Sequence, residues 1–150
     1  MFHARFLWRA ILALFFLLVS ADLFAQVDGA EKRQKLMKDN GASLKAIKAA
    51  ADANDYATIE AKAKNIIRNG DKVLDLFRKS QTAEKTRAKP EIWEKWDEFS
   101  KNPGKVKKAA TELADAAKAK DDSVIAVRVN TLSEACASCH STFRAEKYSE

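Results

Sequence analysis

Apolar residues recur every three or four positions along most of the chain after residue 28, which is the spacing of one helix face. The pattern is clearest near the C-terminus, where the steps are four, three, four, three and four residues. The six positions that share this face are Ile125, Val129, Leu132, Cys136, Cys139 and Phe143. No run of alternating β-branched residues appears beside it. The pattern therefore predicts an all-α fold.

Four helices are expected, over residues 28–52, 56–77 and 102–120 and after the cap candidates at residues 121–123. Capping residues precede them: Asp28 with Glu31 forms a capping box, Asn54 or Asp55 precedes the second helix, and Asp121 to Ser123 precede the fourth. Two features weaken the pattern. Asn40-Gly41 predicts a kink or a close approach to the backbone, and Pro90 restarts a less regular segment between Ser80 and Lys101. The whole predicts an antiparallel four-helix bundle with a cofactor site in its core.

The N-terminus carries a different pattern. Arg5 and Arg9 precede an unbroken apolar run over residues 10–19, and small residues follow. Ten apolar residues fall short of the roughly 20 that span a bilayer. We therefore expect a signal peptide over residues 1–25, cleaved after Ala25 or alternatively after Ala21, and a mature domain over residues 26–150 that leaves the membrane.

The net charge of the chain adds little to the prediction of its function. The 150-residue chain has a formal net charge of +6, and its basic residues are scattered rather than grouped in a recognition motif. This is a weak case for nucleic-acid binding. The excess of positive charge predicts solubility and favours an acidic surface on a protein partner.

The chemistry of the chain is concentrated in Cys136-Ala137-Ser138-Cys139-His140. This spacing is the pattern for covalent c-type haem attachment, in which the two thiols hold the porphyrin and His140 binds one axial face of the iron. On a helix these three side chains share a face. Bacterial haem attachment of this type takes place outside the cytoplasm, in agreement with the expected signal peptide. We predict one covalent haem c in a periplasmic protein.

Two other uses of a Cys-x-x-Cys pair fit less well. A thioredoxin-like redox pair is expected near a βαβ pattern, which this sequence lacks. A structural zinc site needs four ligands, and the chain has no other Cys and only one further His, His3, within the expected signal peptide.

The same scarcity limits the second axial position. A second His is excluded in the mature chain, and Met37 is its only methionine. Met with His is a common axial pair in electron-transfer haems. Met37 is therefore the predicted second ligand, although a Met at such a position can also serve only as a flexible core residue.

Three further residues are candidates for haem contact. Arg33 lies one helical turn before Met37, and Arg144 one turn after His140. Arginine pairs well with carboxylates, such as haem propionates. Trp93 belongs to an aromatic cluster with Trp96 and Phe99, and it either packs on the haem edge or closes the end of the core.

Three stretches resemble the cytochrome c′ and cytochrome c-556 family, the class II c-type cytochromes. Residues 33–38 (RQKLMK) are similar to its first-helix motif, residues 85–93 (KTRAKPEIW) to its middle segment, and residues 136–144 to its closing haem motif. The resemblance implies a four-helix bundle around one haem, with residue 37 over the distal face of the iron. Many cytochromes c′ also form homodimers through their first two helices, although no large apolar outer stripe demands this here.

The resemblance also implies two alternative functions. In the c-556 branch a Met completes a low-spin iron suited to electron transfer. In the c′ branch an apolar residue leaves a five-coordinate, high-spin iron that binds nitric oxide or carbon monoxide, and some of these members also carry a Met there. We expect the first: an electron carrier, not an enzyme, that exchanges electrons with periplasmic redox proteins.

Overall fold

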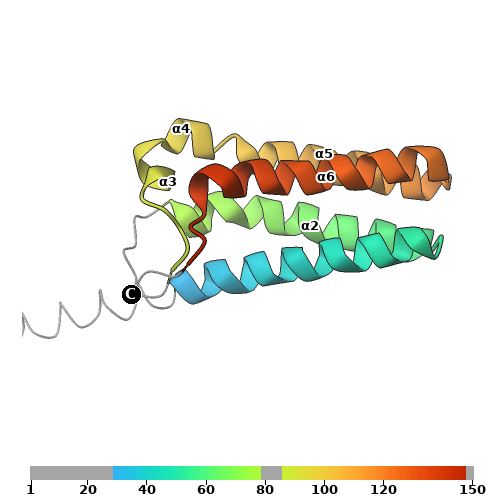
Figure 1. The fold of residues 1–150 in the computed structure, drawn as a ribbon, viewed down its shortest axis with the longest axis horizontal. Helices are drawn as coiled ribbons and strands as arrows, with labels where there is room; N and C mark the ends of the chain where they lie inside the picture. The colour runs from blue at the N-terminus through green and yellow to red at the C-terminus, as the bar shows by residue number, and fades with distance from the viewer. Residues whose placement is uncertain (1–28, 79–85, 148–150) are drawn as a thin grey trace, which may run out of the picture.

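The structure is a computed structural model that describes residues 29–78 and 86–147. Its long helices lie side by side, and successive ones run in opposite directions (Figure 1). They are an N-terminal helix over residues 29–52, α2 (Tyr56–Phe77), α5 (Asn102–Ala119) and α6 (Asp122–Phe143). Two short helices, α3 (Glu91–Glu94) and α4 (Trp96–Phe99), lie together at one end of the bundle. The predicted all-α, antiparallel four-helix bundle is confirmed.

The two tight turns at the other end of the bundle have the same construction. Asn54 and Lys120 adopt left-handed backbone conformations, with φ of 53° and 58°. An aspartate follows each of them and caps the next helix, because Asp55 accepts from the N–H of Thr58 and Asp121 from that of Val124. Hydrogen bonds from the hydroxyls of Thr58 and Ser123, followed by these backbone N–H groups, lower the pKa of the Asp55 and Asp121 carboxyl groups. Of the caps that the sequence offered, Asp55 and Asp121 are the ones used.

Two details of the helix pattern differ from expectation. The N-terminal helix continues without interruption through Asn40 and Gly41, and a Cβ built on Gly41 would meet no atom within 4 Å. Pro90 stands one residue before α3 rather than at its first position. Asp28, the expected first cap, and residues 1–25, the expected signal peptide, lie outside the described residues. Within the described residues, no helix is long and apolar enough to cross a membrane.

The core of the bundle consists of two clusters. One lies toward the tight turns and contains large apolar side chains such as Ile47, Ile66 and Leu132 together with several alanines of α5. The other lies against α3 and α4, where Phe99 packs on Phe77 and Phe143 with ring centroids 5.2 and 5.3 Å away. The residues that separate the two clusters form the functional site described below.

Helices α2 and α5 pack closely at Gly70. A Cβ at this position would lie 2.6 Å from Cγ of Lys107, which is nearer than two carbon atoms can approach. Lys107 itself pairs with Asp71 on α2, so its side chain is held across this contact. Gly70 therefore allows the two helices to approach. By contrast, a Cβ at Gly104, in the first turn of α5, would meet no atom within 4 Å.

We predict opposite effects for alanine at these two glycines. Gly70→Ala should destabilise the fold by about 1–2 kcal/mol, because overpacking costs about 1–3 kcal/mol and better helix propensity returns up to about 1 kcal/mol. Gly104→Ala, the matched control, should stabilise it by about 0.5 kcal/mol. Urea unfolding of both variants measures these changes, and equal stability of the two would contradict the close contact at Gly70.

Candidate haem site

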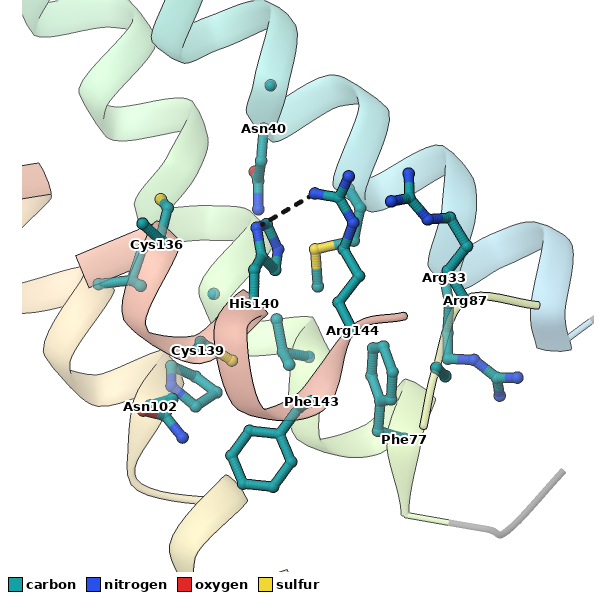
Figure 2. Close-up of a pocket in the computed structure, with 18 of the residues that line it drawn as sticks. Arg33, Asn40, Phe77, Arg87, Asn102, Cys136, Cys139, His140, Phe143 and Arg144 are labelled. Atoms are coloured by element: carbon teal, nitrogen blue, oxygen red, sulfur yellow. Dashed lines mark hydrogen bonds between the residues drawn. The ribbon is translucent and has the colours of Figure 1, made fainter. Parts of the chain in front are cut away.

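A cavity of about 560 Å³ lies between the four long helices, toward the end that α3 and α4 close. Its walls are formed by the N-terminal helix, α2, α5 and α6, and residues of the 86–99 segment line part of it. Figure 2 shows side chains from opposite helices pointing into this space. The volume falls in the range of roughly 300–1,000 Å³ that small-molecule and cofactor pockets occupy. The bundle therefore has room for one cofactor.

Helix α6 presents two thiols and an imidazole to the cavity. Cys136, Cys139 and His140 all line it, and all three are half-buried. They share one helix face because positions three and four residues apart lie next to each other on a helix. Both cysteines are free thiols. This wall therefore carries the complete set of groups that the Cys-x-x-Cys-His motif predicts.

Burial keeps both thiols protonated. Desolvation raises the pKa of Cys136. At Cys139, desolvation and the neighbouring Cys136 raise the pKa to about 11, although Lys105 opposes the shift. Both residues therefore carry an S–H at neutral pH. The S–H form is the one whose sulfur and hydrogen add across a vinyl double bond when a thioether forms.

The imidazole of His140 is kept neutral. Burial lowers its pKa most strongly, and the positive charges of Arg144 and Arg87 lower it further. Nη1 of Arg144 lies 3.4 Å from Nδ1 of His140, a long contact for a hydrogen bond (Figure 2). A neutral imidazole has a free lone pair for a metal. His140 is therefore in the protonation state that iron ligation requires.

A short pairing of two extended segments fixes the end of α6 next to this imidazole. The N–H of Lys89 donates to the carbonyl of Phe143 at 3.1 Å, and the N–H of Ala145 donates to that of Arg87 at 2.8 Å. Nε of Arg87 also donates to the carbonyl of Ala145, at 2.8 Å. The pairing brings Arg87, which is distant in sequence, to the same end of the cavity as His140.

The opposite wall is one face of the N-terminal helix. Eight of its residues line the cavity, and four of them follow one another at steps of four, three and four positions, namely Arg33, Met37, Asn40 and Leu44. Met37 is half-buried and supplies a thioether sulfur to this wall. The cavity therefore lies between a helix that carries two thiols and an imidazole and a helix that carries a thioether.

Arg33 is buried at the edge of this wall, with only 3% of its surface exposed. Its Nη1 donates to the carbonyl of Leu76 at 3.4 Å, and its guanidinium lies 5.2 Å from the ring centroid of Phe77. Burial lowers the pKa of Arg33, although an arginine remains charged under all ordinary conditions. A buried cation next to a cavity favours an anionic group of the ligand.

The charges around the cavity all have one sign. Its basic lining residues are Arg33, Lys38, Lys48, Arg87 and Arg144, and no carboxylate lines it within the described part of the chain. The remaining surface is mostly apolar, with Val73, Ile92 and Val106 among its members. Such a site suits a ligand with a large apolar body and negatively charged substituents.

These properties fit a haem. The volume and apolar walls suit a porphyrin, the basic residues suit its propionates, and the thiols of Cys136 and Cys139 suit its vinyl groups. His140 and Met37 line opposite walls of the cavity, and an imidazole nitrogen and a thioether sulfur are both donors that would hold a haem iron. The residues therefore fit this cofactor in shape, charge and donor chemistry.

A sequence model of the family described as Cytochrome C′ matches residues 28–144. The chain belongs to the cytochrome c′ family. It is similar to cytochrome c-556 of Rhodopseudomonas palustris, with 29% identity over 85% of this chain and 89% of that protein. It is also similar to cytochrome c-556 of Agrobacterium fabrum, with 34% identity over 78% of this chain and 81% of that protein.

A solved structure confirms the fold of the family. It is that of a cytochrome c′ described by its unusual ligand-controlled dimer dissociation. The likeness has a TM-score of 0.73 at 24% identity, and it covers 81% of this chain and 97% of the solved one. At this level of identity the likeness shows the bundle alone.

Six of the seven residues that the sequence singled out line the cavity of this cytochrome c′ family member, namely Arg33, Met37, Cys136, Cys139, His140 and Arg144. Trp93 is not among the described lining residues. Its indole Nε1 donates to the carbonyl of Phe77 at 2.8 Å, and its side chain packs against the cluster at the α3–α4 end. The structure thus gives Trp93 a place at the end of the core, and its contact with haem stays a prediction.

Arg87 and Asn40 are among the polar residues of this cytochrome site that sequence reasoning missed. Arg87 lies within the middle segment that carried the family resemblance, but only the pairing with residues 143–145 places it near His140. Asn40 was considered only as a weak point in a helix. Its spacing of three residues from Met37 was the available signal that it faces the same way.

We predict that Trp93→Phe destabilises the cytochrome by about 1 kcal/mol, because the carbonyl of Phe77 loses its hydrogen-bond donor. The optical spectrum of the haem should not change. Trp96→Phe is the matched control, since its ring packs on Phe99 at 5.6 Å and no described residue accepts a hydrogen bond from it. A displaced Soret band in Trp93→Phe alone would instead place the indole against the haem.

Proposed function

We propose that this chain is a periplasmic monohaem c-type cytochrome that transfers electrons, with a low-spin iron between His140 and Met37. The observation that carries the proposal is the position of Met37 on the wall of the cavity opposite the helix of His140. It agrees with the names of the relatives, both cytochromes c-556. We assign no catalytic residue, and the partners would be other periplasmic redox proteins.

The residues of the chain then have distinct roles. Cys136 and Cys139 hold the haem c through two thioether bonds, and His140 binds one axial face. Arg33, Arg87 and Arg144 offset the negative charge of the propionates. The haem supplies the one-electron chemistry, and the apolar walls set its potential by excluding water. A Met ligand on the second face leaves little to rearrange when the iron changes oxidation state.

Export rests on the sequence of residues 1–25. A basic start, an apolar run and small residues before Ala25 or Ala21 predict removal of this segment during secretion. Haem attachment to the thiols then takes place in the same compartment. The mass of the mature protein would distinguish the two cleavage positions.

A second function is the binding of nitric oxide or carbon monoxide at a five-coordinate iron. The family model and the solved structure favour it. The family model is described as Cytochrome C′, and the solved structure is a cytochrome c′ whose dimer dissociates under ligand control. In that case Met37 would line the distal side without bonding to the iron. A homodimer of this chain, if it behaves as that protein does, would dissociate under ligand control.

The variant Met37→Ala separates the two functions. We predict low-spin optical bands for the wild type in both oxidation states and conversion to high-spin iron in the variant, because the sulfur ligand is lost. Leu44→Ala is the matched control, since Leu44 lines the same wall and offers no donor atom. A high-spin wild type that takes up carbon monoxide readily would reject the electron carrier in favour of the second function.

Covalent attachment has its own test. In wild-type protein the haem should stay with the polypeptide after extraction with acidified acetone, because thioether bonds survive this treatment. The double variant Cys136→Ser, Cys139→Ser should release all of it. Haem retained by the double variant, or extracted from the wild type, would contradict attachment through these two sulfurs.

A further inference from the structure

A chain of polar side chains connects the cavity with the interface between the N-terminal helix and α2. Asn69 of α2 is buried, and its Nδ2 donates to Oδ2 of Asp39 at 2.7 Å and to Oδ1 of Asn40 at 2.8 Å. Nδ2 of Asn65, one turn earlier on α2, also donates to Oδ2 of Asp39, at 2.8 Å. Asp39 and Asn40 are neighbours on the N-terminal helix, but only Asn40 lines the cavity.

The charge of Asp39 fixes which way the amide of Asn69 faces. A carboxylate only accepts hydrogen bonds, so the group of Asn69 that meets it must be the NH₂ donor. Asn69 and Asn65 both donate to the same oxygen of Asp39, Oδ2. Amide orientations are normally assigned from such networks, and here a charged group at one end allows only one assignment.

The amide of Asn40 is oriented in turn. Because the NH₂ of Asn69 points at it, the atom of Asn40 on that side must be its oxygen. Its Nδ2 therefore faces the other way. Figure 2 shows this nitrogen at the tip of the side chain, which extends into the cavity toward the side of His140. Within the described residues, no hydrogen bond from this nitrogen is found.

We propose that Asn40 is a ligand-binding residue, and that its Nδ2 donates a hydrogen bond to the electronegative atom of a small ligand that enters the cavity opposite His140. Asn69 is the positioning residue that aims this donor, with Asp39 as its anchor. The proposal rests on a haem iron held by His140, which both forms of the proposed function share, and it applies where Met37 leaves the second axial position open. Donors on this side of a haem decide how strongly small ligands bind.

Cyanide on ferric iron and carbon monoxide on ferrous iron are the probes. Both are measured in holoprotein that carries Met37→Ala, so that the second axial position is open. In this background Asn40→Leu should raise the dissociation constant of cyanide about tenfold, as expected for a lost hydrogen bond to an anion. It should also move the stretching band of bound carbon monoxide to higher frequency, because a donor near the oxygen lowers this frequency.

Two variants of α2 test the aiming of the amide. Asn69→Leu removes the group that orients Asn40 and should reproduce both effects in the same direction. Asn65→Leu is the matched control: it removes an equivalent hydrogen bond to Asp39, but the hydrogen bonds that Asn65 donates go to Asp39 and Ser43 and not to Asn40. It should change the cyanide affinity less than twofold and leave the carbon monoxide band in place.

Two outcomes would contradict the proposal. Equal cyanide affinities in Asn40→Leu and Asn65→Leu would overturn the proposal, as would a lower affinity without a shift of the carbon monoxide band, since packing alone would then explain it. If Asn69→Leu fails to fold, Asn40→Leu decides the question. The spin state of the wild type tests the role of Met37 separately, and a high-spin wild type would allow the same measurements without the Met37→Ala change.

Discussion

The four long helices must pack stably around a large cavity, and the rest of the structure depends on this constraint. Core residues normally pack without voids, and an unfilled apolar space forfeits the contacts of the atoms around it. A small domain has only about 5–15 kcal/mol of net stability, so an open cavity of about 560 Å³ is a large liability. The two core clusters pack the helices together, and residues of the second, such as Phe77, Ile92 and Phe143, also line the cavity. A cofactor that fills the space therefore completes the core as well as supplying the chemistry.

Most of the fold could be predicted because its signals are local. The bounds of α2 follow from its apolar period and from Asp55, and the inward face of α6 from regular steps that end at Phe143. The predicted weakness at Asn40-Gly41 does not interrupt the helix, because packing along its whole length outweighs the propensity of two residues. Propensity is a weak prior wherever tertiary contacts act on the same residues.

The position of a site residue could be predicted from the sequence where it lies on the same helix as the other site residues. Cys136, Cys139 and His140 lie within one helical turn, so their convergence follows from helix geometry alone. Arg87 reaches the site only through backbone pairing with residues 143–145, which no local pattern encodes. The direction of the Asn40 amide depends on the register between two helices, since Asn69 must lie opposite it. Contacts between distant segments are the part that sequence patterns do not specify.

The two walls of the cavity are held by different kinds of interaction, and this separates attachment from reactivity. On α6, the haem-binding groups are fixed by one helix and by the pairing at its end. On the N-terminal helix, Asn40 and Asp39 accept hydrogen bonds from the buried amide of Asn69 on α2. Hydrogen bonds are directional, whereas apolar contacts are not. This interface therefore restricts the rotation of the N-terminal helix about its own axis more strongly than apolar packing alone would. The side chains that face the second axial position therefore depend on the packing of the first two helices. A change at that interface would therefore alter the direction of the Asn40 side chain while Cys136, Cys139 and His140 kept their places on α6.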